Sequence, residues 1–340
     1  MNKMRFAIVG AGVIAPFHAK AIVQHPDAEL VAVSDIEVAK AKKLGELYAI
    51  PHIYSDYEQM LKRDDIDVVS VTVPSGLHRE VTIAAAQAGK HVLCEKPLEI
   101  TSNKMTQMIE ACKQNGVKLG CVFQRRVMPT SILAKKAIME GKLGKLVLGD
   151  AYLKYYRSPE YYRSAGWRGT WELDGGGALM NQGVHGIDLI QWLTGDVSSV
   201  FAYSAPLLRE IEVEDTAVVV LKYKNGAFGV IQGTTSVYPA QETRFELHGE
   251  KGSIIFGDSG FKQWKFIDSE EEMPQVEAMV NSSSDPAKIA SDGHYILVDD
   301  MIKAIREDRD PLISGEEARK SVDLILAIYE SSRTGKEVVL

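Results

Sequence analysis

A glycine-rich turn near the start of the chain has the spacing of a dinucleotide-binding site. Residues 10–15, GAGVIA, read G-x-G-x-x-A and join an apolar stretch to an amphipathic one. Gly10 permits a tight turn, Gly12 leaves room for a pyrophosphate, and Ala15 keeps helix and strand close. A helix that begins here presents free N–H groups to phosphates. We therefore expect this turn to bind a dinucleotide through Gly10, Gly12, Val13, Ile14 and Ala15.

An acidic residue at the end of the next apolar stretch favours NAD over NADP. Asp35 lies 20 residues after Ala15, where a carboxylate can accept hydrogen bonds from the ribose hydroxyls of NAD. The next residue is Ile36 rather than Arg, so nothing adjacent neutralises a 2′-phosphate. Lys40 lies too far along the following helix to replace such an arginine. The alternative role of Asp35 is to cap the helix that follows.

A lysine after a later apolar stretch is a candidate for stabilising negative charge. Lys96 lies between Glu95 and Pro97, directly after the run HVLC at 91–94. Ligands of open parallel sheets bind beyond the carboxyl ends of the strands. Pro97 restricts Lys96 to an extended backbone. Lys96 would then donate to a substrate oxygen, although a lysine at a strand end is more often an ordinary surface charge.

A second glycine-rich segment, 174–188, leads into a helix with polar residues on one face. Asn181, His185, Asp188 and Trp192 are spaced at i, i+4, i+7 and i+11, which predicts one helical stripe. This composition suits a lined cleft better than a solvent-facing surface. The ordinary pKa of an imidazole is near ~6.5, so His185 is a candidate general base.

Aromatic and arginine residues are dense between positions 155 and 171. Aromatic faces pack on the C–H surfaces of sugar rings, and arginine binds hydroxyls, carboxylates or phosphates. We expect Arg157, Trp167 and Arg168 to contact the substrate, and with Arg163 they leave an anionic sugar possible. The alternative is that the segment packs a long loop against the sheet or a neighbouring subunit.

Together these motifs resemble the Gfo/Idh/MocA oxidoreductase family, named for glucose–fructose oxidoreductase and inositol dehydrogenase. GAGVIA, Asp35, EKP at 95–97 and GGGALMNQGVHGID at 175–188 match in the family's order, over nearly the whole chain. The resemblance implies an α/β fold, with an N-terminal Rossmann domain and a C-terminal domain built on a large open sheet. It also implies dimers or tetramers formed through that sheet, and hydride transfer at a secondary carbinol of a sugar or cyclitol.

The resemblance carries over to individual residues. Lys96 and His185 match the active-site lysine and histidine. Asn181 stands four residues before the histidine, where many members, including inositol dehydrogenases, have Asp. An amide can position a hydroxyl but takes no proton, which weakens an inositol dehydrogenase assignment. Further cofactor contacts are expected from Pro74, Ser75, His78, Glu95, Lys96 and Gln124, although each polar residue could simply satisfy its loop.

The expected reaction removes a hydride from a substrate C–H while His185 takes the hydroxyl proton and Lys96 stabilises the alkoxide. NAD⁺ would accept the hydride. Two alternatives stay open. The first is an enzyme that retains NAD to cleave glycosides or to pass hydride between two sugars. The second is a non-catalytic nucleotide-sensing protein, which the presence of both Lys96 and His185 disfavours.

The pattern of apolar stretches predicts an NAD-binding domain over 1–123. Short apolar runs alternate with helical patterns, which indicates a doubly wound parallel sheet. Strands are predicted at 5–9, 30–34, 68–73, 91–94 and 118–122, and helices at 17–24, 38–48, 79–88 and 103–115. Ser102 is the expected cap of the last helix, and Gly89 and Gly116 follow helical runs as closing residues.

Residues 124–340 are predicted to form an α+β domain for substrate binding and oligomerisation. Its sheet is expected to be mostly antiparallel, with a hairpin at Asn225-Gly226. Strand patterns occur at 146–156, 199–203, 216–223, 227–235, 243–248 and 253–256. A helix is predicted at 130–140 and a polar loop at 282–292, and helices at 295–307 and 316–333 should pack back onto the core.

Composition excludes several classes of protein. With 45% hydrophobic and 25% charged residues, the 340-residue chain resembles an average soluble globular protein. A net charge of −7 gives no basic field for nucleic acid. No apolar run approaches the ~18 residues of a membrane span. Residues 1–15 imitate a signal peptide, but cleavage there would destroy the phosphate-binding turn, so a first strand is the better interpretation.

The three cysteines predict a reducing, cytoplasmic compartment. Cys94, Cys112 and Cys121 form no CxxC pair and no compact cluster with histidine, so we expect buried thiols and no metal site.

Overall fold

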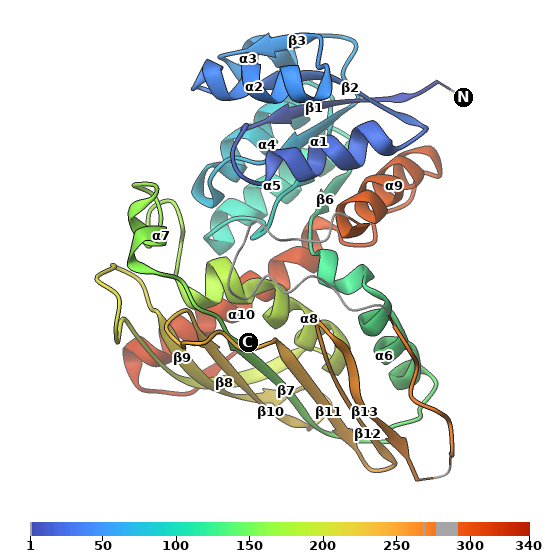
Figure 1. The fold of residues 1–340 in the computed structure, drawn as a ribbon, viewed down its shortest axis with the longest axis vertical. Coiled ribbons are helices and arrows are strands. Elements are labelled where there is room, and N and C mark those ends of the chain that lie inside the picture. The colour runs from blue at the N-terminus through green and yellow to red at the C-terminus, as the bar shows by residue number, and fades with distance from the viewer. Residues whose placement is uncertain (1, 268, 277–291) are drawn as a thin grey trace. The chain divides into compact units, whose positions relative to one another are not determined.

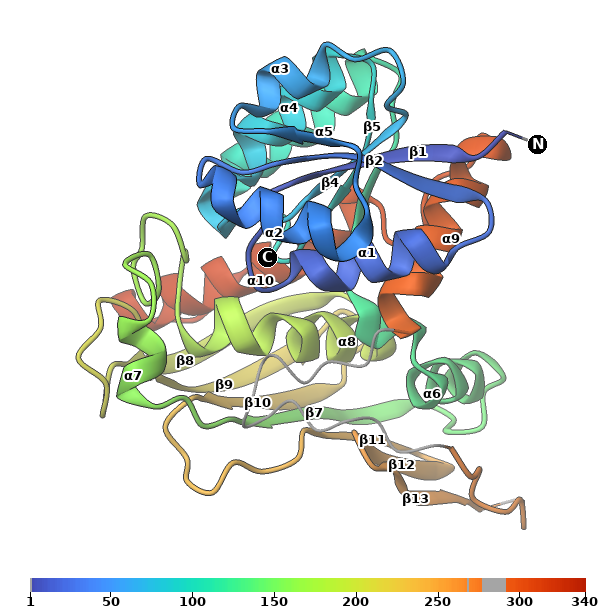
Figure 2. The same ribbon diagram turned by 45° about the horizontal axis from the view of Figure 1, so that its top comes forward.

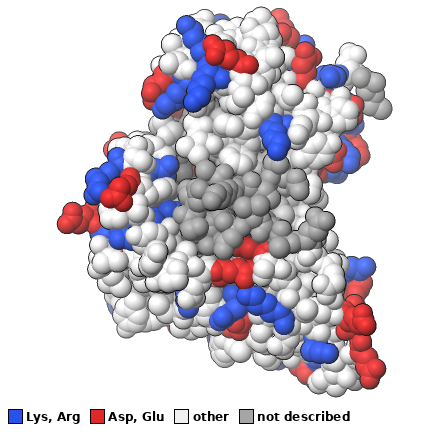
Figure 3. Space-filling model, viewed as in Figure 1, with Lys and Arg blue, Asp and Glu red and all other residues white. Residues whose placement is uncertain are grey.

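A computed structural model gives the structure of residues 2–267, 269–276 and 292–340. The chain divides into two compact units. The first comprises Met1–Gln124 and Ser291–Arg319, and the second Arg125–Ala290 and Lys320–Leu340. No helix among the described residues is long and apolar enough to cross a membrane. On the described part of the face in Figure 3, Lys and Arg side chains are interspersed with Asp and Glu rather than gathered into one basic region.

The first unit is built on a six-stranded parallel sheet in the order β3-β2-β1-β4-β5-β6 (Figure 1). Every neighbouring pair is parallel, which confirms the doubly wound sheet. The order reverses between β1 and β4, where a crevice forms at the carboxyl ends of the strands in folds of this kind. The strands are β1 Met4–Val9, β2 Ala28–Ser34, β3 His52–Tyr54, β4 Val68–Val71, β5 His91–Cys94 and β6 Leu119–Cys121.

Helices cover both faces of this sheet. Figure 2 shows α1 and α2 on one side and α3, α4 and α5 on the other. Their bounds are α1 Ala15–Gln24, α2 Val38–Tyr48, α3 Tyr57–Leu61, η1 Ser75–Leu77, α4 His78–Gln87 and α5 Ser102–Gln114. The first unit also includes α9, Asp292–Arg306, which packs against α1. The Nε2 atom of His25, just after α1, lies 3.2 Å from Asp299 Oδ1 of α9.

Two local predictions for this unit were wrong. Thr101 caps α5 in place of Ser102, because Thr101 keeps the extended backbone of a cap while Ser102 is already helical. The Thr101 hydroxyl accepts a hydrogen bond from the amide of Lys104. The sequence also missed β3 and α3, which have three and five residues and are too short for a periodic pattern. Cys94, Cys112 and Cys121 are buried, as expected.

The second unit is built on an eight-stranded sheet in the order β13-β12-β11-β7-β10-β9-β8-β14. Only β7 and β10 pair in parallel, which confirms a mostly antiparallel sheet. The predicted hairpin joins β9 and β10, with Gly226 at φ +90°. The strands are β7 Leu146–Lys154, β8 Val197–Ala205, β9 Thr216–Tyr223, β10 Phe228–Thr234, β11 Arg244–Gly249, β12 Gly252–Gly257, β13 Gly260–Phe266 and β14 Val338–Val339.

Helices of the second unit lie against one face of this sheet, where α8 packs on β7. A π-helical turn at Ala178–Gly183 runs directly into α8, Val184–Thr194. The other helices are α6 Pro129–Met139, α7 Pro159–Arg163 and α10 Gly315–Thr334, whose first residues belong to the first unit. The polar loop predicted at 282–292 lies outside the described residues, except for Asp292, where α9 begins.

Candidate functional site

The glycine turn between β1 and α1 has the geometry of a phosphate cradle. Gly10 has φ +97°, and a Cβ on it would lie 2.7 Å from the carbonyl group of Thr72, so only glycine fits. A Cβ on Gly12 would meet no atom within 4 Å, which leaves open space above the turn. Ala15 is buried at the start of α1. Open space beside a helix N-terminus fits a dinucleotide pyrophosphate.

Asp35 is held beside this turn. One carboxylate oxygen accepts a hydrogen bond from the amide of Ala11 at 2.7 Å, and the other accepts one from the amide of Glu37 at 2.7 Å. The residue preceding α2 is Glu37, so Asp35 is not the helix cap. Ile36 is 90% exposed, and Lys40 pairs with Glu37 at 2.5 Å. A carboxylate has about four lone-pair sites, so Asp35 keeps capacity for ribose hydroxyls.

The loop after β4 is tied to the turn that follows Lys96. His78 is buried, with Nδ1 2.9 Å from the Pro97 carbonyl oxygen and Nε2 3.0 Å from that of Val73. The His78 ring therefore satisfies its own loop, the alternative left open by the sequence. Pro74 precedes the short helix η1, which begins at the half-buried Ser75.

Gln124 follows β6 and is buried at the end of the first unit. Its Oε1 atom has no hydrogen-bond partner among the described residues. An unsatisfied buried acceptor is costly, so this oxygen is suited to a donor from a ligand or water.

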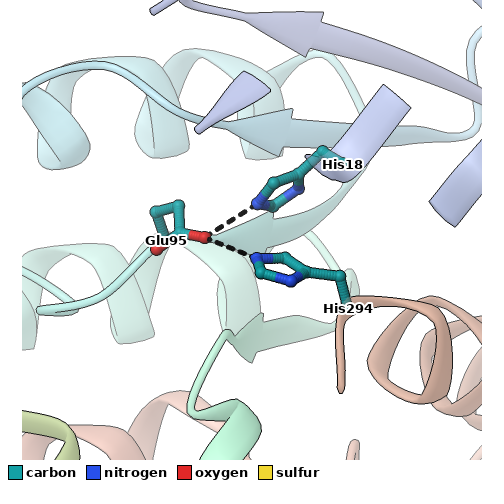
Figure 4. A group of neighbouring side chains, drawn as sticks. All are labelled: His18, Glu95 and His294. Carbon is teal, nitrogen blue, oxygen red and sulfur yellow. Dashed lines mark hydrogen bonds and ion pairs between the residues drawn. The ribbon is translucent and has the colours of Figure 1, made fainter. Parts of the chain in front are cut away.

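Glu95, directly before Lys96, lies in a buried cluster with two histidines (Figure 4). Its Oε1 atom is 2.9 Å from His18 Nε2 and 3.4 Å from His294 Nε2. Its Oε2 atom accepts a hydrogen bond from the Lys96 amide at 3.0 Å. Burial alone would raise the pKa of Glu95, but the hydrogen bonds from both histidines hold that pKa well below its ordinary value. Burial lowers the pKa of His18.

These three residues carry atoms of the kind that bind zinc, all within 4.8 Å of one another. The hydrogen-bond lengths around Glu95 favour a network without metal. A metal-bound imidazole normally donates its second N–H to an acceptor. His294 Nδ1 is buried and has no hydrogen-bond partner among the described residues, so the outer partner of a metal ligand is lacking.

Asn181 and His185 lie in the second unit, whereas Lys96 lies in the first. Asn181 donates through Nδ2 to Asp174 Oδ1 at 2.6 Å, and Asp174 Oδ2 accepts from the Gly169 amide at 2.8 Å. The predicted stripe spans two helical segments, because Asn181 lies in the π-helical turn whereas His185, Asp188 and Trp192 lie on α8. Asp188 is buried in an ion pair with Arg126.

Glu214 fixes the start of the π-helical turn. It accepts hydrogen bonds from the amides of Gly177 and Leu179 at 2.9 and 2.8 Å and from the Tyr329 hydroxyl at 3.0 Å. Burial nevertheless raises the pKa of Glu214 to about 7.

Two of the three arginines in the aromatic segment gather around Tyr161. Arg157 is buried and donates to Gln182 Oε1 at 2.6 Å, and its guanidinium lies 5.6 Å from the Tyr161 ring. The Arg168 guanidinium lies 4.2 Å from that ring and 4.7 Å from Trp167. Gln182 donates to the Tyr161 hydroxyl at 3.0 Å. Arg163 is exposed and pairs with Glu160 instead.

Several residues of these clusters were not predicted. His18 belongs to the apolar pattern of α1, His294 lies 199 positions from Glu95, and Glu214 lies 37 positions from Gly177. Local spacing gives no signal for contacts of such sequence separation. For Glu214, the sequence offered one weak sign of a buried carboxylate, namely the run Val213-Glu214-Asp215 directly before β9.

Two family models match the chain. Residues 4–123 match the model described as "Oxidoreductase family, NAD-binding Rossmann fold", and residues 132–255 match the "GFO/IDH/MocA C-terminal domain". The crystal structure of the WlbA dehydrogenase from Bordetella pertussis, in complex with NADH and UDP-GlcNAcA, superposes with a TM-score of 0.90. It is 37% identical, over 100% of this chain and 99% of that chain.

Two curated relatives act on different polyols. Myo-inositol 2-dehydrogenase from Thermotoga maritima is 28% identical, over 99% of this chain and 98% of the relative. Levoglucosan dehydrogenase from Pseudarthrobacter phenanthrenivorans is also 28% identical, over 75% of this chain and 74% of the relative.

Proposed function

The chain belongs to the Gfo/Idh/MocA family and is an NAD(H)-dependent dehydrogenase, and from this premise we propose that it oxidises a secondary hydroxyl of a negatively charged, nucleotide-linked sugar. The observation that carries the proposal is the cluster of Arg157, Arg168, Tyr161 and Gln182 next to Asn181. A buried guanidinium recognises a carboxylate or phosphate through charge-assisted hydrogen bonds. The 37% identity to a WlbA dehydrogenase crystallised with UDP-GlcNAcA supports the same class of substrate.

Residues of the first unit would hold the cofactor. The backbone at Gly10, Gly12, Val13, Ile14 and Ala15 would bind the pyrophosphate, because the turn leaves open space beside the N-terminus of α1. The main chain at Pro74, Ser75, Glu95 and Lys96, which follow β4 and β5, would line the edge on which the cofactor lies. The unsatisfied oxygen of Gln124 would accept a hydrogen bond from the nicotinamide carboxamide. When bound, NAD⁺ supplies the hydride acceptor.

Three side chains would perform the proton and charge chemistry. His185 takes the proton of the substrate hydroxyl, and Lys96 donates to the same oxygen and stabilises its negative charge. Asn181 positions the hydroxyl through its amide, whose orientation is fixed by Asp174. Arg157, Trp167 and Arg168 bind the rest of the substrate.

NAD is the preferred cofactor in this proposal. The carboxylate of Asp35 would repel a 2′-phosphate, and the exposed neighbour Ile36 offers no charge to bind one. The three buried cysteines suit a reducing cytoplasm.

The outer face of the second sheet would join subunits into a dimer or tetramer. Pairing places Tyr203 beside Val218, and Val220 between Phe201 and Val230. Tyr203, Val218 and Val220 are exposed, as is Phe228 on the neighbouring strand. A contiguous exposed apolar patch of this kind marks an interaction surface.

A substrate panel tests the proposed reaction. Acidic UDP-sugars, neutral UDP-sugars, free sugars, sugar phosphates and inositols are each incubated with NAD⁺ and with NADP⁺, and reduced cofactor is followed by absorbance. We expect turnover of an acidic UDP-sugar with NAD⁺. A higher kcat/KM for a neutral sugar or an inositol would refute the anionic-substrate assignment. Nucleotide that stays bound through purification would instead favour transfer between two sugars or NAD-assisted glycoside cleavage.

Variants of the two clustered arginines test whether the substrate carries a negative charge. Arg157→Gln and Arg168→Gln should raise KM for the acidic sugar by about tenfold, because each removes one charge-assisted contact. The exposed Arg163→Gln is the matched control and should leave KM unchanged.

A further inference from the structure

We propose that His18 and His294 act through Glu95 as positioning residues for Lys96. The inference rests on the proposed function, in which Lys96 stabilises charge on the substrate oxygen. Three separate elements contribute to the network: His18 lies on α1, Glu95 follows β5, and His294 lies on α9 (Figure 4). All three side chains are buried, and all three belong to the first unit.

The hydrogen-bond pattern fixes the protonation of His18. A carboxylate only accepts hydrogen bonds, so His18 Nε2 must carry the proton that it shares with Glu95. In a neutral ring Nδ1 is then an acceptor, and Ser70 Oγ lies 3.1 Å from it as the donor. The pKa of His18 is lowered by burial, which agrees with a neutral ring. His18 therefore contributes a directed dipole to Glu95.

Glu95 transmits this restraint to Lys96. With one oxygen facing both imidazoles, its other oxygen receives the Lys96 amide at 3.0 Å. The main chain from which the lysine side chain extends is thus bound to a carboxylate that is fixed on its other side. A small displacement of a catalytic group from its productive position lowers turnover strongly.

The same carboxylate connects the lysine to the phosphate-binding helix. His18 is the fourth residue of α1, whose N-terminus follows the glycine turn. One network therefore sets the distance between the backbone of Lys96 and the part of the unit that would carry the pyrophosphate. His294 adds α9 to this network from a distant part of the sequence.

The central test replaces the charge without changing the shape. Glu95→Gln should lower kcat about 10- to 100-fold, while the Kd for NADH stays within about twofold. Glu99→Gln is the matched control. Glu99 is also buried, and it accepts from the amides of Ile100 and Thr101 and pairs with Lys104 at 2.9 Å. These three bonds of Glu99 involve neither Lys96 nor the two histidines, so the kcat of Glu99→Gln should change by less than about twofold.

A second pair of variants separates positioning from general destabilisation. His294→Gln keeps an N–H donor for Glu95, whereas His294→Leu does not, so the Gln variant should retain more of kcat. His25→Gln is the control, because His25 also joins the end of α1 to α9 without touching Glu95. Equal kcat for His294→Gln and His294→Leu, or an unchanged kcat in Glu95→Gln, would overturn the proposal.

NMR spectroscopy tests the hydrogen-bond network around Glu95 without a measurement of activity. In the NADH complex, the backbone amide resonance of Lys96 should shift in Glu95→Gln and His294→Leu but not in Glu99→Gln. Histidine ¹⁵N spectra should show a neutral Nε2–H tautomer for His18. Absence of turnover by the wild type would count against the proposed function alone. One bound metal ion per chain, lost in His294→Gln, would overturn the hydrogen-bonded network.

Discussion

Arg126 and Asp188 form a bidentate ion pair in the interior of the second unit. Arg126 Nε donates to Asp188 Oδ2 at 2.8 Å, and Nη2 donates to Oδ1 at 2.7 Å. The side chains are 6% and 1% exposed, and the guanidinium lies 5.8 Å from the ring of Trp192. Asp188 lies three residues after His185 on α8, so the pair fixes the rotation of the helix that carries the proposed base.

Breaking this pair should destabilise the protein strongly. Asp188→Ala removes the carboxylate with which the buried Arg126 guanidinium pairs, and we expect the free energy of unfolding to fall by about 3–5 kcal/mol in urea denaturation. The exposed pair of Lys118 and Asp308 provides the control. Asp308→Ala should cost no more than about 1 kcal/mol. The double variant Arg126→Met, Asp188→Leu should recover most of the lost stability, because both charges of the buried pair are removed together. A double variant as unstable as Asp188→Ala would contradict this account.

Removing either proposed catalytic group should abolish most turnover without loss of cofactor. Lys96→Ala removes the donor to the substrate oxygen, and His185→Ala removes the base. We expect kcat to fall at least about 100-fold in each variant, since general acid–base groups contribute 10²–10⁴-fold. NADH binding, followed by fluorescence titration, should stay intact. Unchanged turnover in either variant would remove that residue from the mechanism.

Cofactor preference should respond to the residues after β2. The double variant Asp35→Ser, Ile36→Arg removes the repelling carboxylate and places a cation at an exposed position. We expect the ratio of kcat/KM for NADP⁺ to that for NAD⁺ to rise by at least about 100-fold. Glu37→Gln changes a neighbouring carboxylate and should leave the ratio unaltered. A wild type active only with NADP⁺ would contradict the role of Asp35.

Stability should decline as Glu214 ionises. Burial raises the folded-state pKa of Glu214 from 4.5 to about 7, so folding favours the protonated form. Its contribution is therefore fully present below pH 4.5 and is lost as the pH rises through about 7. The difference in pKa corresponds to on the order of 3 kcal/mol.

Denaturation measured across this pH range tests Glu214. Glu214→Gln should flatten the decline, although it also lowers stability throughout, because three donors converge on a side chain that can no longer accept them all. The exposed Glu172→Gln should keep the wild-type slope. The same slope in both variants would show that another group titrates.

Periodic burial explains which elements the sequence could predict. The last four residues of β1 and all of β4 are buried because helices cover both faces of their sheet, and burial alternates along β9 because only one face is covered. Such patterns are local, so they can be recognised in a single sequence. The π-helical turn at 178–183 was not predictable. Over only six residues, the hydrophobic spacing of a π-helix hardly differs from that of an α-helix.

The individual motifs were recognisable for a different reason. The glycine turn and Asp35 lie close in sequence and have a fixed spacing, and the structure places the Asp35 carboxylate on the turn. The partners of Asp188 and Glu95 come from residues 62 and 199 positions away. Contacts of that separation depend on how α8 and α9 pack, which the spacing of a single sequence does not encode.

Because α9 belongs to the first unit, synthesis cannot finish that unit until nearly the whole chain has been made. A ribosome delivers Glu95 and His18 early, whereas His294 follows 199 residues after Glu95. Until then the buried carboxylate has one imidazole donor instead of two. The turn that carries Lys96 therefore reaches its final arrangement late, after strands β7 to β13 have been translated, and a truncated chain of 124 residues would lack this last support.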